Sequence, residues 1–376
     1  MRFVEEYRDP RAADVLLDRI HALAPSAPSR FMEVCGGHTH TIYRHGLEQL
    51  LPPEVELVHG PGCPVCVIPM GRVDDAIALA ETPGVVLTTF GDLLRVPGST
   101  GSLLDAKARG ADVRIVYSPL DALALAVDHP DREIVFFAVG FETTAPSTAR
   151  TVLRARDDGV ANFSAFVNHV TIGPPLRAIL AAPDAGLDGL IGPGHVSTVI
   201  GLEPYRFVAE ELATPIVVAG FEPLDLLDSV ARLLTQRVEG RCEVENQYGR
   251  VVRPEGNPVA QALLDEAFVT RPSFEWRGLG ALPDSGLALR PELDAWDAEA
   301  RFELPGRRVA DPRACQCGQV LRGALKPWEC KVFGTACTPE HPIGTCMVSS
   351  EGACAAYHRY GRMSREVAIS LGRPGA

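Results

Sequence analysis

The sequence lacks the features that mark membrane-spanning, secreted and nucleic-acid-binding proteins. No apolar run approaches the roughly twenty residues that a helix needs to cross a bilayer. The first residues, MRFVEEYRDPRAADVLLDRI, contain no basic-then-apolar leader, which indicates a cytoplasmic protein. Lys and Arg number 36 against 48 Asp and Glu, and the net charge of -12 argues against general binding to nucleic acid or anionic membranes.

The sequence does contain enough apolar material for a large globular protein. Of its 376 residues, 46% are hydrophobic and 22% are charged, which are ordinary proportions for a folded chain. A chain of this length exceeds what one hydrophobic core usually organises, so two or three domains are expected.

From residue 30 to about residue 225, short apolar runs alternate with stretches of helical periodicity. This alternation is typical of α/β domains with mainly parallel sheets. Helices are expected at residues 74–81, 102–109, 121–128 and 147–156. Strands are expected at residues 31–34, 55–59, 85–90, 113–117, 134–139, 164–168, 186–191 and 216–219.

Two pairs of similar segments indicate an internal duplication. AVGFETTAP (138–146) resembles VAGFEPLD (218–225), and HGPGCPVC (59–66) resembles IGPGHVS (191–197). We therefore predict two similar Rossmann-like lobes, at 30–125 and 126–225, and a third domain formed by 1–29 with 226–376. Gly and Pro where the strands end favour tight loops at the carboxyl edge of the sheet, where open α/β sheets bind ligands.

The first candidate site is FMEVCGGHTH, in which a strand ends at Cys35 and two glycines precede His38 and His40. A thiol and two imidazoles in one loop are the side chains of a metal or redox site. The alternative is a buried cysteine with hydrogen-bonded histidines, since free Cys is among the most buried residue types.

The second is GPGCPVC, which places Cys63 and Cys66 in a C-x-x-C spacing. Two sulfurs at this spacing form a disulfide or bind one metal ion. The stretch from Pro69 onward is expected to be helical, and a helix N-terminus favours thiolates nearby. Half of a structural zinc site is the alternative, although a second C-x-x-C is missing and Cys35 would complete only three ligands.

The C-terminal tail holds six cysteines, which match no zinc-knuckle repeat and no C-x-x-x-C-x-x-C motif of radical enzymes. Four of them, Cys315, Cys330, Cys337 and Cys354, are spaced C-x14-C-x6-C-x16-C, and four thiolates are what a [4Fe-4S] cluster requires. Cys317 and Cys346 are alternative ligands. Two structural zinc ions are the competing interpretation. The tail has too few apolar residues for a core of its own, and we expect it to pack with the N-terminal helix.

Two further Gly-rich loops follow strands. GFETTAP carries Glu142, and GPGHVS carries His195. Such loops bind anions or carry protons, but a helix cap at Glu142 and a turn at His195 are equally compatible with the sequence. Cys242 has no partner in the sequence and is expected to be inert.

The motifs CGGHTH, GPGCPVC, GFETTAP, GPGHVS and MVSSEGACAAY, in this order over nearly the whole chain, resemble the HypD family of hydrogenase formation proteins. The resemblance implies a monomer that works with the chaperone HypC and the cyanide donor HypE, and indirectly with the hydrogenase large subunit. It implies that Cys35 binds the iron that acquires two cyanides and one carbonyl, shared with a cysteine of the chaperone. Cys63 and Cys66 would be the redox pair beside it, and His38 a proton donor.

Two other functions fit the same residues. One is a thiol–disulfide reductase in which an iron–sulfur cluster reduces the Cys63/Cys66 disulfide, and the other is a zinc-bound structural tail. A reductase does not need the third thiol at Cys35, whereas an iron scaffold does.

Overall fold

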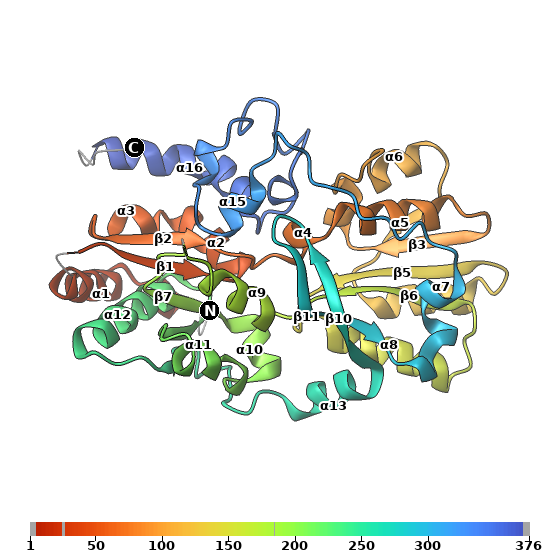
Figure 1. The fold of residues 1–376 in the computed structure, drawn as a ribbon, viewed down its shortest axis with the longest axis horizontal. Coiled ribbons are helices and arrows are strands. Elements are labelled where there is room, and N and C mark those ends of the chain that lie inside the picture. Colours follow the sequence, from red (N-terminus) through yellow and green to blue (C-terminus); the bar gives the residue numbers. More distant parts are fainter. Residues whose placement is uncertain (1–4, 25–26, 184, 371–376) are drawn as a thin grey trace.

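The computed structural model describes residues 5–24, 27–183 and 185–370. Two β-sheets lie along the long axis of the molecule, and the tail covers the region where they meet (Figure 1). Parts of the predicted domains, residues 1–4, 25–26, 184 and 371–376, lie outside the described residues. No helix within the described ranges is both long and apolar enough to cross a membrane.

The first sheet has five parallel strands in the order β2-β1-β7-β8-β9. Its inner strands β7 and β8 are apolar and fully buried, as expected when helices cover both faces of a parallel sheet. Helix α12 (Pro223–Glu239) packs on this sheet and against α1 (Pro10–Leu23). The strands are β1 (Ser29–Glu33), β2 (Val55–His59), β7 (Gly189–Pro193), β8 (Ile216–Ala219) and β9 (Val244–Asn246).

The second sheet has four parallel strands in the order β4-β3-β5-β6. Ser102 and Ser118 start two of its helices with capping boxes, which satisfy backbone N–H groups of the first turn. The strands are β3 (Val85–Thr89), β4 (Val113–Ile115), β5 (Glu133–Gly140) and β6 (Phe163–His169). The helices include α5 (Met70–Glu81), α6 (Leu103–Ala108), α7 (Pro119–Asp128) and α8 (Ala145–Asp157).

The predicted α/β class with mainly parallel sheets is confirmed, but the two sheets group the strands differently from the contiguous lobes at 30–125 and 126–225. Strands β1 and β2 pair in one sheet with β7 and β8, because the chain builds the second sheet and then returns to the first. Strand order follows from crossover connections and side-chain packing, which the apolar runs of a sequence do not encode.

The sequence analysis missed an antiparallel hairpin, β10 (Phe268–Trp276) with β11 (Gly280–Leu289). The hairpin crosses between the two sheets (Figure 1), and Val170 bridges to Gly286. Trp276 at its tip is buried with a ring centroid 5.9 Å from that of Phe141. The hairpin therefore closes the gap between the sheets with apolar side chains.

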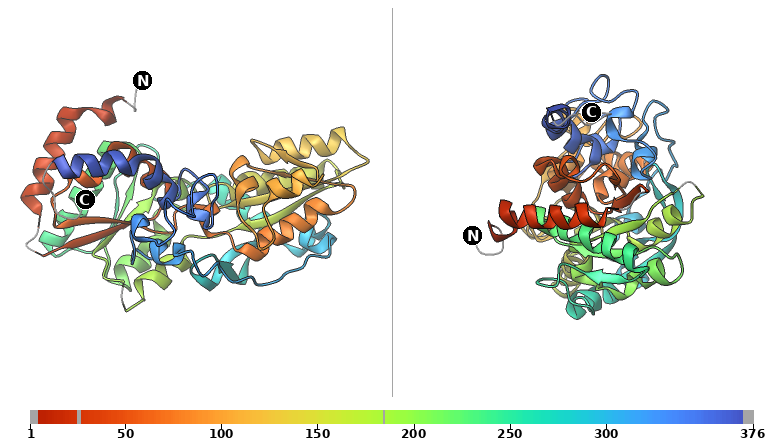
Figure 2. Two further views of the ribbon diagram at one scale, coloured as in Figure 1. Left: turned by 90° about the horizontal axis from the view of Figure 1, so that it is seen from above. Right: turned by 90° about the vertical axis from the view of Figure 1, so that its left-hand side faces the viewer.

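The tail folds over the junction with short helices, among them α15 (Cys317–Leu321), and ends in α16 (Ala353–Ser370). Helix α16 packs on α2 (Gly36–His45), and the N-terminal helix α1 packs on α12. The expected packing of the tail on α1 stays a prediction; Figure 2 shows the N-terminal helix in red and α16 in blue. The tail shares a core with the first sheet and the hairpin, since Cys317, Cys346 and Cys354 belong to one apolar cluster with Val34 and Trp276. Val348 of the tail joins a second cluster with Val85 and Leu87 of β3.

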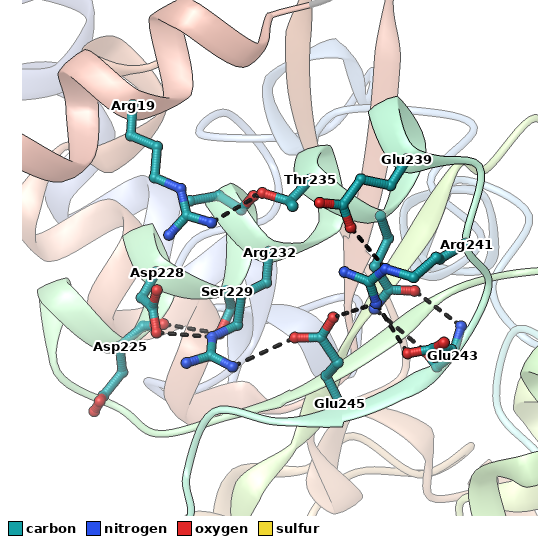
Figure 3. A network of polar contacts seen from close by, with 12 residues as sticks. Arg19, Asp225, Asp228, Ser229, Arg232, Thr235, Glu239, Arg241, Glu243 and Glu245 are labelled. Atoms are coloured by element: carbon teal, nitrogen blue, oxygen red, sulfur yellow. Dashed lines mark hydrogen bonds and ion pairs between the residues drawn. The ribbon is translucent and has the colours of Figure 1, made fainter.

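A charged network covers the outer edge of the first sheet (Figure 3). Glu245 of edge strand β9 pairs with Arg232 at 3.3 Å and with Arg241 at 3.2 Å. Arg19 of α1 donates to Thr235 Oγ1 of α12 at 3.0 Å. Exposed pairs of this kind contribute at most about 1 kcal/mol each, but charges on an edge strand disfavour pairing with another chain.

Candidate functional site

A small cavity lies where the carboxyl ends of strands from both sheets meet. Its volume is about 170 Å³, below the roughly 300–1,000 Å³ of sites for drug-sized ligands. Strands β1, β2 and β7 of one sheet and β5 of the other end beside it, the usual place for a ligand in open α/β sheets. All five sequence motifs line it, through Val34, Cys35, Gly62, Pro64, Phe141, Thr143, Thr144, Pro193, His195, Val196 and Glu351, together with Ile172.

Cys35 forms part of the cavity wall and is 7% exposed. Its sulfur accepts hydrogen bonds from the backbone N–H groups of Gly37 and His195. Burial, and then the carboxylates of Glu351 and Glu33, raise the pKa of this thiol, while the two N–H groups oppose the shift. The site therefore favours a neutral thiol at neutral pH, and a bound metal cation would replace its proton.

A buried polar network beneath Cys35 was missed by the sequence analysis. One carboxylate oxygen of Glu33 accepts the N–H of Cys35 at 2.9 Å, and the other lies 2.7 Å from Nδ1 of His59 and accepts from Thr39 Oγ1. Glu33 and His59 are register partners at the ends of β1 and β2, and both are buried. Glu33 thus connects the loop of Cys35 to the loop of Cys63. The only sequence signal was a carboxylate in an otherwise apolar strand.

Gly62 lies so close to the Cys35 loop that no side chain fits there. A Cβ at Gly62 would be 2.3 Å from the backbone nitrogen and 2.4 Å from the Cα of Cys35. We expect Gly62→Ala to displace this loop and to lower the free energy of unfolding by about 3 kcal/mol. Gly91→Ala is the matched control, because its Cβ would meet only Ile115 side-chain atoms, at 3.9 and 4.0 Å. Denaturant unfolding of both variants checks this, and equal stabilities would contradict the close packing at Gly62.

Phe221 lies between the two histidine rings of the site. Its ring centroid is 4.8 Å from that of His38 and 3.7 Å from that of His195. His195 lines the cavity, whereas His38 is fully buried, with Nε2 3.2 Å from the carbonyl oxygen of Ala219. Burial lowers the pKa of both imidazoles, so both are neutral at neutral pH. The structure thus places the imidazole of His195, and not that of His38, in the cavity wall with Cys35.

The tail is fixed to the cysteine loops by direct contacts. Thr345 Oγ1 donates to the carbonyl oxygen of Cys66 at 2.5 Å. Nδ1 of His40 lies 3.3 Å from the carbonyl oxygen of Ser350. Glu351 then enters the cavity wall, where burial, and then the carboxylates of Asp92 and Glu33, raise its pKa.

Cys63 and Cys66 are part of a continuous group of sulfurs that reaches into the tail. The Cys66 thiol hydrogen-bonds to Cys346 and to Cys63, and the Cys346 sulfur also contacts Cys317 and Cys354. All five are buried, and none of the ten cysteines forms a disulfide. The structure therefore joins two motifs that are about 280 residues apart in sequence.

Hydrogen bonds within this group shift the pKa values of its thiols in opposite directions. Hydrogen bonds from Cys317, Cys354 and Cys66 lower the pKa of Cys346. Hydrogen bonds to Cys346 and Cys63, together with burial, raise the pKa of Cys66. The expectation that the helix after the C-x-x-C pair favours a thiolate was therefore wrong for Cys66, because its neighbours are other thiols in an apolar surrounding.

The remaining tail cysteines lie at the outer side of the group. A Cβ at Gly344 would be 2.4 Å from Sγ of Cys315 and 2.5 Å from Sγ of Cys317, so these two sulfurs are adjacent. Cys337 is buried, and Cys330 is half-buried at the end of a short helical turn. Within the described part of the chain, no three His, Cys, Asp or Glu side chains converge in the geometry of a metal site. The thiols supply the soft donors that iron–sulfur clusters use.

Glu142 is buried beside the cavity. Its Oε1 accepts the N–H of Ile172 at 2.9 Å, while Oε2 has no hydrogen-bond partner among the described residues. Ile172 is the N-cap residue of a helix, so the expected capping role of Glu142 is compatible with this contact. Burial raises the pKa of the carboxyl to about 7.

This shift predicts a pH dependence of stability. The carboxyl ordinarily titrates near pH 4.5, so between that pH and about pH 7 the folded chain keeps a proton that the unfolded chain has lost. Stability should therefore fall by about 3 kcal/mol as the pH rises through this interval. Glu142→Gln should remove this component, whereas Glu255→Gln, at an exposed position, should not. Unfolding at pH 5 and pH 8 measures the difference, and parallel profiles for wild type and Glu142→Gln would contradict it.

Comparison with known proteins gives the context of this site. A family model described as "HypD: Hydrogenase formation hypA family" matches residues 11–361. The chain belongs to the HypD family. It is 56% identical over 375 residues to the hydrogenase maturation factor HypD of Rhizobium leguminosarum bv. viciae, covering 98% of this chain and 97% of that protein. It is 50% identical over 372 residues to the HypD protein of Escherichia coli (strain K12), covering 97% of this chain and all of that protein. The resemblance of the five motifs to the HypD family is thus confirmed, and the relatives that the chain matches are hydrogenase maturation factors.

Proposed function

We propose that this chain is the scaffold on which the Fe(CN)₂CO unit of NiFe hydrogenases is assembled, in the cytoplasm, with HypC as chaperone and HypE as cyanide donor. The observation that carries the proposal is the single cavity lined by all five motifs, with the Cys35 thiol in its wall. A cavity of about 170 Å³ suits a metal ion with diatomic ligands better than an organic substrate.

Cys35 is the proposed iron ligand. A thiolate is a soft donor that suits low-spin iron, and the N–H groups of Gly37 and His195 limit the charge that it donates. Glu351 and His195 lie in the same wall, so they are placed to hold or release a proton when ligands arrive. A cysteine of the chaperone would complete the iron coordination from the open side.

Cys63 and Cys66 are the proposed redox pair, and the tail sulfurs their electron supply. The Cys346 thiolate attacks Cys66 of an oxidised pair, so that the Cys63–Cys66 bond breaks and Cys63 leaves as a thiolate. Cys317 then attacks Cys346, which releases Cys66 and leaves a Cys317–Cys346 disulfide. Two electrons and two protons return that disulfide to two thiols. The hydrogen-bonded contacts of Cys66 with Cys346 and of Cys346 with Cys317 support this order.

Cys315, Cys330, Cys337 and Cys354 are the proposed ligands of a [4Fe-4S] cluster, which would supply single electrons when bound. They are the four tail cysteines that remain when Cys317 and Cys346 are assigned to thiol exchange. Cys317 and Cys346 stay the alternative ligands, since both contact Cys354.

Infrared spectroscopy tests the proposal. The chain is purified without oxygen together with the chaperone, and bands of iron-bound cyanide and carbonyl are expected in a region free of protein absorption. A complex without these bands, in a preparation that still reduces disulfides, would favour the second candidate, an iron–sulfur-dependent thiol–disulfide reductase. The contact between Cys66 and Cys346 fits that reductase equally well, but a reductase gives no role to Cys35.

A further inference from the structure

A second cavity opens on the surface of the tail. Its volume is about 510 Å³, and Cys315 is part of its wall. Three exposed cationic side chains line it, those of Arg313, Arg322 and Lys331. The backbone of this wall is ordered by Gln316, whose Oε1 accepts the N–H of Lys331 at 3.0 Å.

The cavity is positively charged on a chain whose net charge is -12. Its one acidic residue, Asp311, pairs with Arg277 at 3.0 Å and accepts the N–H of Gly278 at 2.9 Å, so its charge is compensated. Neither Arg313 nor Lys331 forms an ion pair with another described residue. An uncompensated positive opening of this kind attracts an anionic partner and raises its rate of association.

The cavity also lies at the outer end of the sulfur group. Cys315 in its wall is adjacent to Cys317, which contacts Cys346, which in turn contacts Cys66. The tail is the outermost layer over the junction of the two sheets (Figure 1). The sulfurs thus connect a cationic surface opening to the loop beside the Cys35 cavity.

We propose that the cationic cavity formed by Arg313, Arg322 and Lys331 docks an acidic protein that delivers electrons one at a time, of the reduced [2Fe-2S] ferredoxin class. The inference rests on the proposed electron supply to Cys63 and Cys66 and adds its source. Two reduced carriers each lose one electron, and the Cys63–Cys66 disulfide takes up these two electrons and two protons from water to give two thiols. The three cations are exposed on the rim, where a protein surface meets them.

Charge reversal at the rim tests this docking. The full chain, with Cys63 and Cys66 oxidised, is mixed without oxygen with a photoreduced acidic [2Fe-2S] ferredoxin, and the new thiols are counted by alkylation and mass spectrometry. We expect Arg313→Glu with Lys331→Glu to slow the reaction about tenfold at low salt, and salt to slow the wild type. Arg206→Glu with Arg253→Glu is the control, since it changes the net charge equally at exposed positions elsewhere.

Two other reductants make the result specific. The methyl viologen radical cation should reduce wild type and the rim variant at similar rates. The proposal would be overturned if ferredoxin reduced the Arg313→Glu, Lys331→Glu variant as fast as it reduces the control variant. It would also be overturned if methyl viologen reduced the Arg313→Glu, Lys331→Glu variant as slowly as ferredoxin does, because these residues would then act on the cysteines themselves. If the Arg313→Glu, Lys331→Glu variant lost only its reduction by glutathione, the cationic cavity would be a site for small anions instead. If methyl viologen fails to reduce the pair in the wild type, the electron supply itself fails, which is a separate outcome.

Discussion

Cys35→Ser should abolish the assembled iron unit while leaving the fold intact. Serine fits the same space and keeps the hydrogen bonds from Gly37 and His195, but its oxygen is a hard donor that binds low-spin iron poorly. We expect the cyanide and carbonyl bands, and hydrogenase activity in cells that depend on this chain, to fall on the order of 100-fold or more. Infrared spectra and a hydrogen-uptake assay measure the two effects.

Cys242→Ser is the matched control for Cys35→Ser. Cys242 is half-buried, with its sulfur 3.5 Å from the carbonyl oxygen of Ala209, and it lines neither described cavity. Its variant should keep wild-type bands and activity. Wild-type bands in Cys35→Ser would mean that the iron is held elsewhere.

Cys346→Ser should separate electron supply from iron binding. A serine cannot take part in thiol–disulfide exchange, so reduction of oxidised Cys63–Cys66 through the tail should slow by at least about 100-fold. Cys35 and the cavity residues are unchanged in this variant, so iron added with an external dithiol reductant should still bind. Thiol counting after addition of a low-potential one-electron donor gives the rate.

The outcome for Cys346→Ser distinguishes two electron paths. An unchanged rate would mean that electrons reach Cys66 without passing Cys346, against the contact between the two sulfurs. If the variant lost iron binding as well as the fast reduction of Cys63–Cys66, Cys346 would mainly hold the tail in place.

The sequence predicted the strands well where burial alone defines them. Strands β2 and β8 have the predicted bounds, and β5 is an apolar run with every residue after its first buried. The β10–β11 hairpin was missed because FVTRPSFEW contains a proline, and its residues become a strand only through pairing with β11. Sheet order was not predictable either, because residues of β1 pair with residues of β7 that lie 158 positions further along the chain.

The candidate site was predicted in its residues and only partly in its arrangement. Cys35, Cys63 and His195 were identified from their motifs, but the contact of Cys66 with Cys346 depends on how the tail lies over the junction. Glu33 and Glu351 were not singled out. Each is a single carboxylate whose proximity to Cys35 follows from sheet register or tail packing, and neither can be read from spacing.

We propose that the tail thiols form an iron–sulfur electron supply for the Cys63–Cys66 pair beside the Cys35 cavity. Metal content and spin-resonance spectra of the chain purified without oxygen, wild type beside Cys330→Ser, test it most directly. We expect about four irons per chain in the wild type and a cluster signal that is lost in the variant. Zinc without iron in the wild type would contradict it, because the tail would then be a structural clasp with no electrons to deliver.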